Sequence, residues 1–378
     1  LDDERKWFRY HNLFQKILIK RLDRRVDQEW IKSMQLAAAN WYEKEGLIDE
    51  ALDNLMMADE CEKAAKLVTT YAHAEFINGV GKVETWLKKL PTELKENNPS
   101  LQLLKAWHAF GQFQLERIPP ILEKVNELIK GTEPEYQVIA ELGFFQGNFQ
   151  YWMGDTEGSI KTLSQALSHY DQLPSHVRCN IQLVLTMAMQ KNGAYDKIVP
   201  EIKRNINNTE RNTGIDIGYL YGVLTFTYLL SGKLRNAHDA AVIMQLHTKK
   251  VRQDFLLNWS HYLQALAEIQ LFQTEKALKH FEIISKKYFI VDTRAVFDSM
   301  AATALIQQFN NNSVEATRLI TDAIDFANKI GDPQSLMVVR SAQARIALIK
   351  GDLQTATEWA NTYNEPPSFA GMFFWQEV

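Results

Sequence analysis

Gly154-Asp155-Thr156-Glu157 is the stretch that decides the fold, because altered copies of it recur downstream at a nearly fixed interval. The copies are Gly193-Ala194-Tyr195-Asp196, Gly232-Lys233-Leu234-Arg235, Phe272-Gln273-Thr274-Glu275, Asn311-Asn312-Ser313-Val314 and Gly351-Asp352-Leu353-Gln354. Successive copies are 39 or 40 residues apart, and a weaker copy stands upstream near Gly111. A constant period of this length indicates an array of stacked structural units.

Two further positions recur at fixed distances in sequence from each turn. Seven residues before the turn the chain carries a small residue, namely Gly147, Thr186, Thr225, Ala265, Ala304 or Ala344. Five residues after it stands Ser159, Ile198, Ala237, Ala277, Ala316 or Ala356, small in all but one case. Small residues at fixed places on two successive helices let the helices cross closely, and the Gly or Asn at the turn ends the first helix. Each unit is therefore predicted to be a helical hairpin.

The small–turn–small spacing resembles the tetratricopeptide repeat, with a unit longer than the usual length of about 34 residues. We expect an all-α fold: tandem helical hairpins in a right-handed superhelix with a concave inner wall, preceded by a short helical arm.

Composition limits the possible functions. Of 378 residues 46% are hydrophobic, and the formal net charge is −4, so the basic excess typical of nucleic-acid binding is missing. The sequence contains no run of 18 apolar residues, so we expect no membrane span. Two widely separated cysteines, Cys61 and Cys179, fit a reducing cytoplasm.

The motifs of common enzymes are missing from the sequence. It contains no G-x-x-x-x-G-K-[ST] phosphate loop, no H-E-x-x-H or C-x-x-C metal motif and no G-x-S-x-G elbow. We therefore predict no catalytic residues, no metal site and no cofactor in this chain.

The first ninety residues carry an ordered series of sequence motifs. It runs through Arg9-Tyr10-His11-Asn12-Leu13-Phe14, then Trp41-Tyr42-Glu43 with Gly46 and Glu50-Ala51, and then Trp86-Leu87-Lys88-Lys89-Leu90-Pro91. This series resembles the LuxR-type large ATP-binding transcription regulators, the MalT-like family. The resemblance covers essentially the whole chain, and its first ninety residues are the specific part.

The resemblance implies a division into residues 1–25 as the end of the module following an ATPase, 26–95 as the helical arm and 96–378 as the superhelical sensor. Because the chain starts at Leu1, we expect a piece of a longer protein. A signalling ATPase that binds ATP or ADP would precede it, and a helix-turn-helix that contacts DNA would follow. The implied partners are a small-molecule inducer and, further, a regulatory protein or a second copy of the protein.

In this repeat type the first helix of each hairpin lines the inner wall, at positions 13, 10, 6, 3 and 2 residues before the turn. The candidate ligand-binding residues are Glu141, Phe144, Asn148, Tyr151, Trp152, Asn180, Tyr219, Trp259, Tyr262 and Asp298. Aromatic faces beside amides and carboxylates suit a sugar or a flat polar metabolite. Two alternatives remain open: many of these residues pack between hairpins, or the wall is a protein- or peptide-binding scaffold.

Overall fold

The computed structural model describes residues 27–76, 81–112, 114–169, 172–207, 214–286, 293–331 and 333–362. The expected end of the ATPase-following module, residues 1–25, lies outside these ranges. Within them the regular structure is helical throughout, so the predicted all-α class is confirmed. None of the described helices is long and apolar enough to cross a membrane.

We call the first described helices, which coincide with the expected arm, the arm. They are α2 (Gln28–Lys44), α3 (Ile48–Met57), α4 (Cys61–Phe76), α5 (Gly81–Lys89) and α6 (Thr92–Asn97). Asp27 begins α2 by accepting a hydrogen bond from the Glu29 amide, as expected of an acidic N-cap. The next hairpin is α7 (Pro99–Gly111) and α8 (Ile118–Ile129), joined through the 3-10 turn η1 (Leu115–Arg117).

The hairpins of the repeat follow in pairs. They are α9 (Tyr136–Trp152) with α10 (Thr156–Ala166), α11 (Ser175–Lys191) with α12 (Tyr195–Asn207), α13 (Gly214–Leu230) with α14 (Leu234–Lys250), α15 (Asp254–Gln270) with α16 (Thr274–Ile284), α17 (Thr293–Phe309) with α18 (Ser313–Ile330), and α19 (Pro333–Lys350) with α20 (Leu353–Thr362). Every predicted turn therefore joins two helices, and the predicted repeat is confirmed.

The turn residues have the conformation that the sequence predicts. At all six turns the backbone is left-handed, with φ from +59° to +86° at Gly154, Gly193, Gly232, Phe272, Asn311 and Gly351. The weaker copy near Gly111 differs: its turn passes through η1, and Gly111 is not among the left-handed residues. A left-handed residue closes the last helical turn and redirects the chain, which fixes where each second helix starts.

The small positions are where the two helices of a hairpin touch. Gly147 shows this most clearly, because a Cβ added there would lie 2.5 Å from Cγ of Leu163 on the partner helix. Ser159, Ala265, Ala277, Ala304 and Ala316 are fully buried at the corresponding positions of other contacts. Close crossing of helices thus depends on these residues being small.

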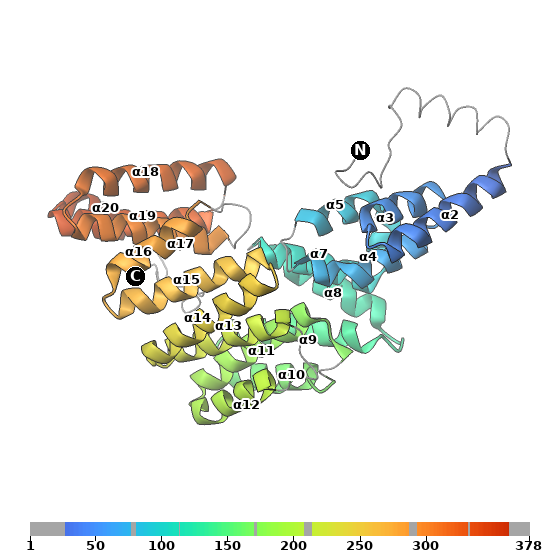
Figure 1. Cartoon of the computed structure of the whole chain (residues 1–378), viewed down its shortest axis with the longest axis horizontal. Coiled ribbons are helices and arrows are strands. Elements are labelled where there is room, and N and C mark those ends of the chain that lie inside the picture. Colours follow the sequence, from blue (N-terminus) through green and yellow to red (C-terminus); the bar gives the residue numbers. More distant parts are fainter. Residues whose placement is uncertain are drawn as a thin grey trace, which may run out of the picture.

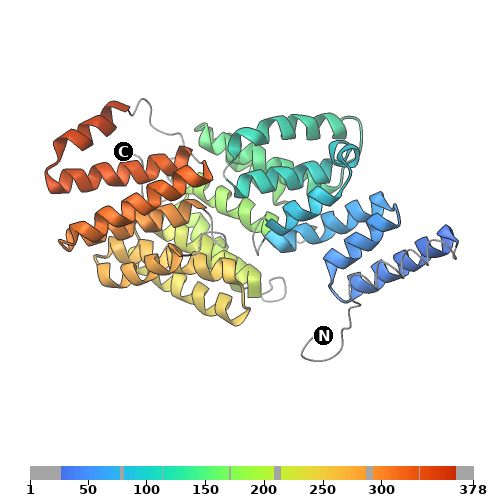
Figure 2. The same ribbon diagram turned by 90° about the horizontal axis from the view of Figure 1, so that it is seen from above.

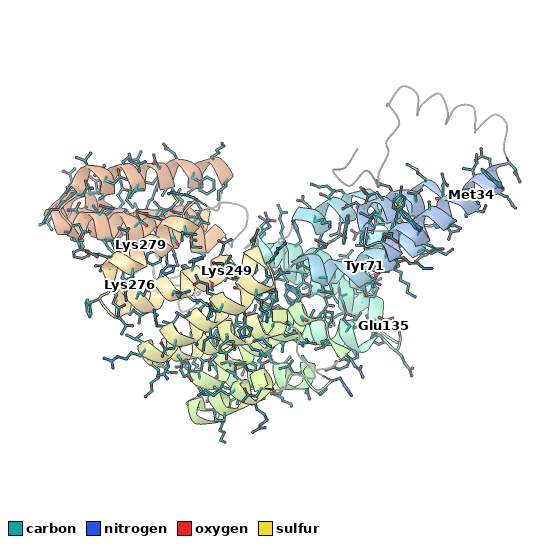
Figure 3. The ribbon with its side chains drawn as sticks, in the orientation of Figure 1. Met34, Tyr71, Glu135, Lys249, Lys276 and Lys279 are labelled. Atoms are coloured by element: carbon teal, nitrogen blue, oxygen red, sulfur yellow. The ribbon has the colours of Figure 1, made fainter. Side chains whose placement is uncertain are left out.

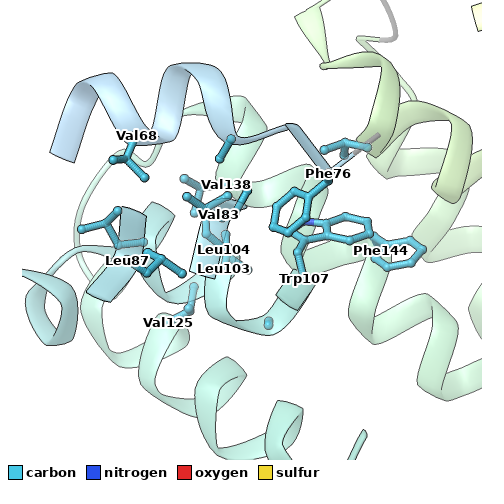
Figure 4. Packing of buried hydrophobic residues seen from close by; sticks show 14 of the residues in the cluster. Val68, Phe76, Val83, Leu87, Leu103, Leu104, Trp107, Val125, Val138 and Phe144 are labelled. Carbon is cyan, nitrogen blue, oxygen red and sulfur yellow. The ribbon is translucent and has the colours of Figure 1, made fainter. Parts of the chain in front are cut away.

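The hairpins stack side by side from the arm to the last helix, so the chain forms an open arc with α2 at one end and α20 at the other (Figures 1 and 2). One buried core joins the arm to the first hairpins, including Val68, Phe76, Trp107 and Phe144 (Figure 4). A second large core joins the later hairpins. The arm helix α4 contacts both α7 and α11, so the arm packs directly against the superhelix.

Candidate ligand-binding wall

The first helices of the hairpins form the wall on which the candidate residues stand. Helix α9 contacts α11, α11 contacts α13, and α13 contacts α15. One aromatic group lies on α13 and α15, where Trp259 is half-buried and stands near Phe226, Phe255 and Tyr262, at ring-centroid distances of 6.1, 6.5 and 5.4 Å. A half-exposed indole held among other rings offers a flat apolar face of the kind that binds planar ligands and sugars.

Tyr262 lies next to this indole and binds Asp298. Both are fully buried, and the Tyr262 hydroxyl donates a hydrogen bond of 2.7 Å to Oδ2 of Asp298. The bond joins α15 to α17 across successive hairpins. Of the candidate residues, the structure therefore brings Trp259, Tyr262 and Asp298 together, with Trp259 as the accessible member.

Tyr219 stands on α13, next to a buried polar group. Asp216 is fully buried and pairs with Arg178 of α11, which also donates to the carbonyl of Leu173. The pKa of Tyr219 is raised above its usual range, first by burial and then by Cys179 and Asp216. Tyr219 thus keeps its hydroxyl proton at neutral pH and can act as a hydrogen-bond donor.

The other candidates lie toward the arm. Tyr151 and Trp152 are half-buried neighbours with ring centroids 5.2 Å apart, and Lys191 of the next hairpin places its Nζ 5.4 Å from the Tyr151 ring. Asn180 is half-buried, and its amide donates to the carbonyl of His176. Asn148 is buried. These residues extend the wall but do not join the Trp259 group.

Glu141 and Phe144 belong to the junction between arm and superhelix. Glu141 is buried, and its carboxylate accepts hydrogen bonds from Trp107 Nε1 at 2.8 Å and Gln137 Nε2 at 2.7 Å. His73 of the arm helix α4 places Nε2 3.0 Å from the same carboxylate. Phe144 is fully buried and stacks on Trp107 with ring centroids 4.5 Å apart. In the structure Glu141 holds the arm helix α4 against the repeats, and Phe144 packs α9 on α7.

His176 completes this junction from α11. Its ring lies 5.2 Å from Phe76, 5.8 Å from His73 and 4.5 Å from Trp107. Burial, and to a smaller extent the neighbouring His73, holds the pKa of His176 well below its usual range. Sequence reasoning did not single out His73 or His176, because their partners are on helices far away in sequence.

The sequence also did not predict a second polar group, the histidine cluster around Glu268. Glu268 of α15 is buried between His238 of α14 and His280 of α16, whose Nε2 atoms lie 3.4 and 3.8 Å from its carboxylate oxygens. Nδ1 of His280 in turn lies 2.7 Å from Nδ1 of His261. Burial raises the pKa of Glu268, and His238 and, less strongly, Lys276, labelled in Figure 3, oppose this shift. The spacing of His261 and Glu268 on one helix was the only available signal.

Among the described residues, no group of three or more His, Cys, Asp or Glu side chains is arranged to hold a metal ion. The carboxylates of Glu141, Asp216 and Asp298 instead bind side chains of the protein itself.

The sequence matches no protein-family model. Solved structures do share the fold. A signal transduction ATPase with numerous domains (STAND) carrying a tetratricopeptide repeat sensor, from Pyrococcus horikoshii, superposes with a TM-score of 0.62 at 16% identity, over 91% of this chain and 55% of that chain. This chain therefore spans about half the length of the Pyrococcus protein.

Two further solved structures share the fold. A Rap protein complexed with competence and sporulation factor matches with a TM-score of 0.53 at 12% identity, over 87% of this chain and 86% of that chain. The apo quorum sensor NprR from B. thuringiensis matches with a TM-score of 0.50 at 13% identity, over 88% and 96% of the two chains. The fold thus places the chain among the tetratricopeptide-like superhelical repeat proteins.

Proposed function

We propose that this chain is the signal-sensing region of a bacterial LuxR/MalT-like transcription regulator, and that it binds a small organic effector on the wall around Trp259. The half-buried indole, flanked by Phe226 and Tyr262, is the observation that carries the proposal. The resemblance of the first ninety residues to the MalT-like family supports the regulatory role. We assign no catalytic step to the chain, and the ATP-binding and DNA-binding modules would belong to a longer protein.

Helix α11 offers a route from the wall to the arm. It carries Asn180 and Lys191 on the wall and, near its start, His176, whose ring packs against Phe76 of the arm helix α4. A ligand that rotates or shifts α11 changes the packing of α4, because close-packed helices move as units. The effector signal would then reach the modules on the other side of the arm.

The ligand class follows from the side chains of the wall. Around Trp259 its half-buried groups are aromatic rings, farther along lie the Asn180 amide and the exposed Lys191, and the buried carboxylates of Asp216, Asp298 and Glu141 already bind protein partners. We expect a largely neutral compound with a flat apolar face and a few hydroxyl or carbonyl groups, such as a sugar or an aromatic metabolite.

A thermal-shift screen of the chain against sugars, aromatic acids and acyl signals tests the proposal. A ligand that binds only the folded state stabilises it by about 2.7 kcal/mol at a hundredfold excess over its Kd. We expect one chemical class to give a saturable shift that Trp259→Ala abolishes. Trp30→Ala, at a tryptophan 48% exposed on the distant helix α2, is the matched control and should keep the shift.

The same experiment separates the alternative, a protein- or peptide-binding scaffold. An extended peptide would contact several hairpins at once, so its binding would weaken with Tyr151→Ala and Trp152→Ala as well as with Trp259→Ala. A saturable small-molecule shift that persists in Trp259→Ala would show that the effector site lies elsewhere, and would overturn the proposed wall.

A further inference from the structure

Phe272 combines two features that both disfavour folding. Its backbone is left-handed, with φ +59°, at a turn where four of the six equivalent positions carry Gly and one carries Asn. A left-handed backbone is strained for a bulky residue, whereas Gly adopts it freely. The side chain is 89% exposed, so burial does not compensate for the strain. Neither the turn nor the core therefore explains a phenylalanine at this position.

Phe272 is not alone at this side of the molecule. The turns of the last two hairpins expose large apolar side chains on either side of their left-handed residues: Phe309 (70%), Val314 (84%), Leu348 (55%) and Leu353 (66%). We call these four residues and Phe272 the turn edge.

The three turns of this edge belong to successive hairpins of one stack. Helix α16 packs on α17, and α18 packs on α19. Across the last two hairpins, Nζ of Lys350 donates to Oγ1 of Thr317 at 2.8 Å, which shows that the ends of these hairpins adjoin. All three turns lie at the same side of the stack in Figure 1, where α16, α18 and α20 begin. The turn edge is therefore a row rather than scattered residues.

The row is almost free of net charge. Residues 271–274 and 309–314 contain no charged side chain, and at the last turn Lys350 and Asp352 have opposite signs. Of the nearby charges, Arg318 pairs with Glu315 and with Asp322, at 2.6 Å each, and Lys276 donates to Gln273, whereas Glu275 is exposed. Asp352 accepts from the amide and hydroxyl of Thr355.

We propose that the turn edge is a self-association surface, which docks on the turn edge of a second copy of this chain around a two-fold axis. In a two-fold dimer a patch must be complementary to itself. An uncharged apolar row meets that condition, whereas a surface of one charge sign would repel its copy. The turn segments 271–274, 307–314 and 348–354 supply about 20 residues, near the lower limit of a standard interface.

The proposal makes Phe272→Gly a variant with two opposite effects. Glycine relieves the left-handed strain, so the monomer should melt about 1–3 °C higher. Loss of the ring should weaken self-association at least tenfold. A side chain with only a structural role would not produce this pair of results. Leu353→Lys gives a second variant, because it places like charges on both sides of the two-fold axis.

Sedimentation equilibrium of the full chain over about 1–200 µM provides the measurement. We expect the mass to rise from 43.6 kDa toward twice that value in the wild type, and to stay monomeric over most of the range in both variants. Met57→Ser, at a methionine 69% exposed on α3, is the control and should associate like the wild type. A wild type that is monomeric throughout, or Phe272→Gly that associates as strongly as the wild type, overturns the proposal. Neither result bears on ligand binding at Trp259.

Discussion

The hydroxyl of Tyr262 and the carboxylate of Asp298 bind each other at 2.7 Å in the interior, where both side chains are fully buried. The two residues are 36 positions apart in the chain and stand on α15 and α17. Their bond fixes the relative position of two successive first helices, beside the half-buried Trp259. A buried hydrogen bond thus holds the residues next to Trp259 in the proposed ligand wall.

Tyr262→Phe should lower the free energy of unfolding by about 1–3 kcal/mol, because the buried Asp298 carboxyl loses the hydrogen bond from Tyr262. Urea denaturation followed by circular dichroism measures the change. Tyr71→Phe is the matched control, since its hydroxyl makes a longer, 3.3 Å bond to Glu43 in a partly exposed position. Equal losses in the two variants would contradict a special role of the Tyr262–Asp298 bond.

Glu141→Ala should loosen the arm. The substitution removes the acceptor for Trp107 Nε1 and the partner of His73. Removing one partner of such a buried interaction should lower the free energy of unfolding by about 3–5 kcal/mol. We expect limited proteolysis to cut within α2–α5 before it cuts the later hairpins. The exposed Glu135, labelled in Figure 3, offers the control Glu135→Ala, which should leave the digestion pattern unchanged. Uniform acceleration of cleavage along the chain would argue against a local junction.

Stability should fall as the pH drops below about 6.5, the ordinary pKa of histidine. The folded-state pKa of the buried His176 is well below that value, so below pH 6.5 the unfolded chain binds a proton that the folded chain does not. Burial, together with His261 and His238, lowers the pKa of His280 to about 4, so this residue also makes the folded state less stable as the pH falls. The raised pKa of Glu268 acts in the opposite direction.

His176→Phe isolates the contribution of the junction. Phenylalanine keeps an aromatic ring against Phe76 and Trp107 but cannot titrate, so the decrease in melting temperature between pH 7.5 and pH 5 should be smaller than in the wild type. At pH 7.5 the melting temperature of the variant should be close to that of the wild type, because the buried Nδ1 of His176 has no hydrogen-bond partner to lose. An unchanged pH dependence would show that His176 does not govern acid stability.

Gly147→Ala should destabilise the chain by about 1–3 kcal/mol, because the added Cβ would lie 2.5 Å from Cγ of Leu163 and force α9 and α10 apart. Gly81→Ala is the control: an added Cβ there meets no atom within 4 Å, and the residue begins α5. Its effect should stay within about 0.5 kcal/mol. Chemical denaturation of both variants decides whether small residues at this position are required by helix crossing.

The sequence alone was sufficient to predict the helical hairpins. Their turns require a left-handed residue and their crossings require small ones, and both requirements are local, so they recur in the sequence at every 39 or 40 residues. Gly154, Gly147 and Ala277 therefore predicted their own structural roles. The same reasoning assigns the first helix of each hairpin to the inner wall, because the position of a residue on a helix follows from its distance to the turn, and this assignment stays a prediction.

Only the tertiary structure decided which wall residues are accessible and which are already bound. Glu141 occupies a predicted wall position, but its partners Trp107 and His73 stand 34 and 68 residues earlier, on helices whose packing no local pattern encodes. Trp259 and Tyr262 are only three positions apart, yet one is half exposed and the other fully buried. Exposure depends on how neighbouring hairpins stack, and this is a property of contacts distant in sequence.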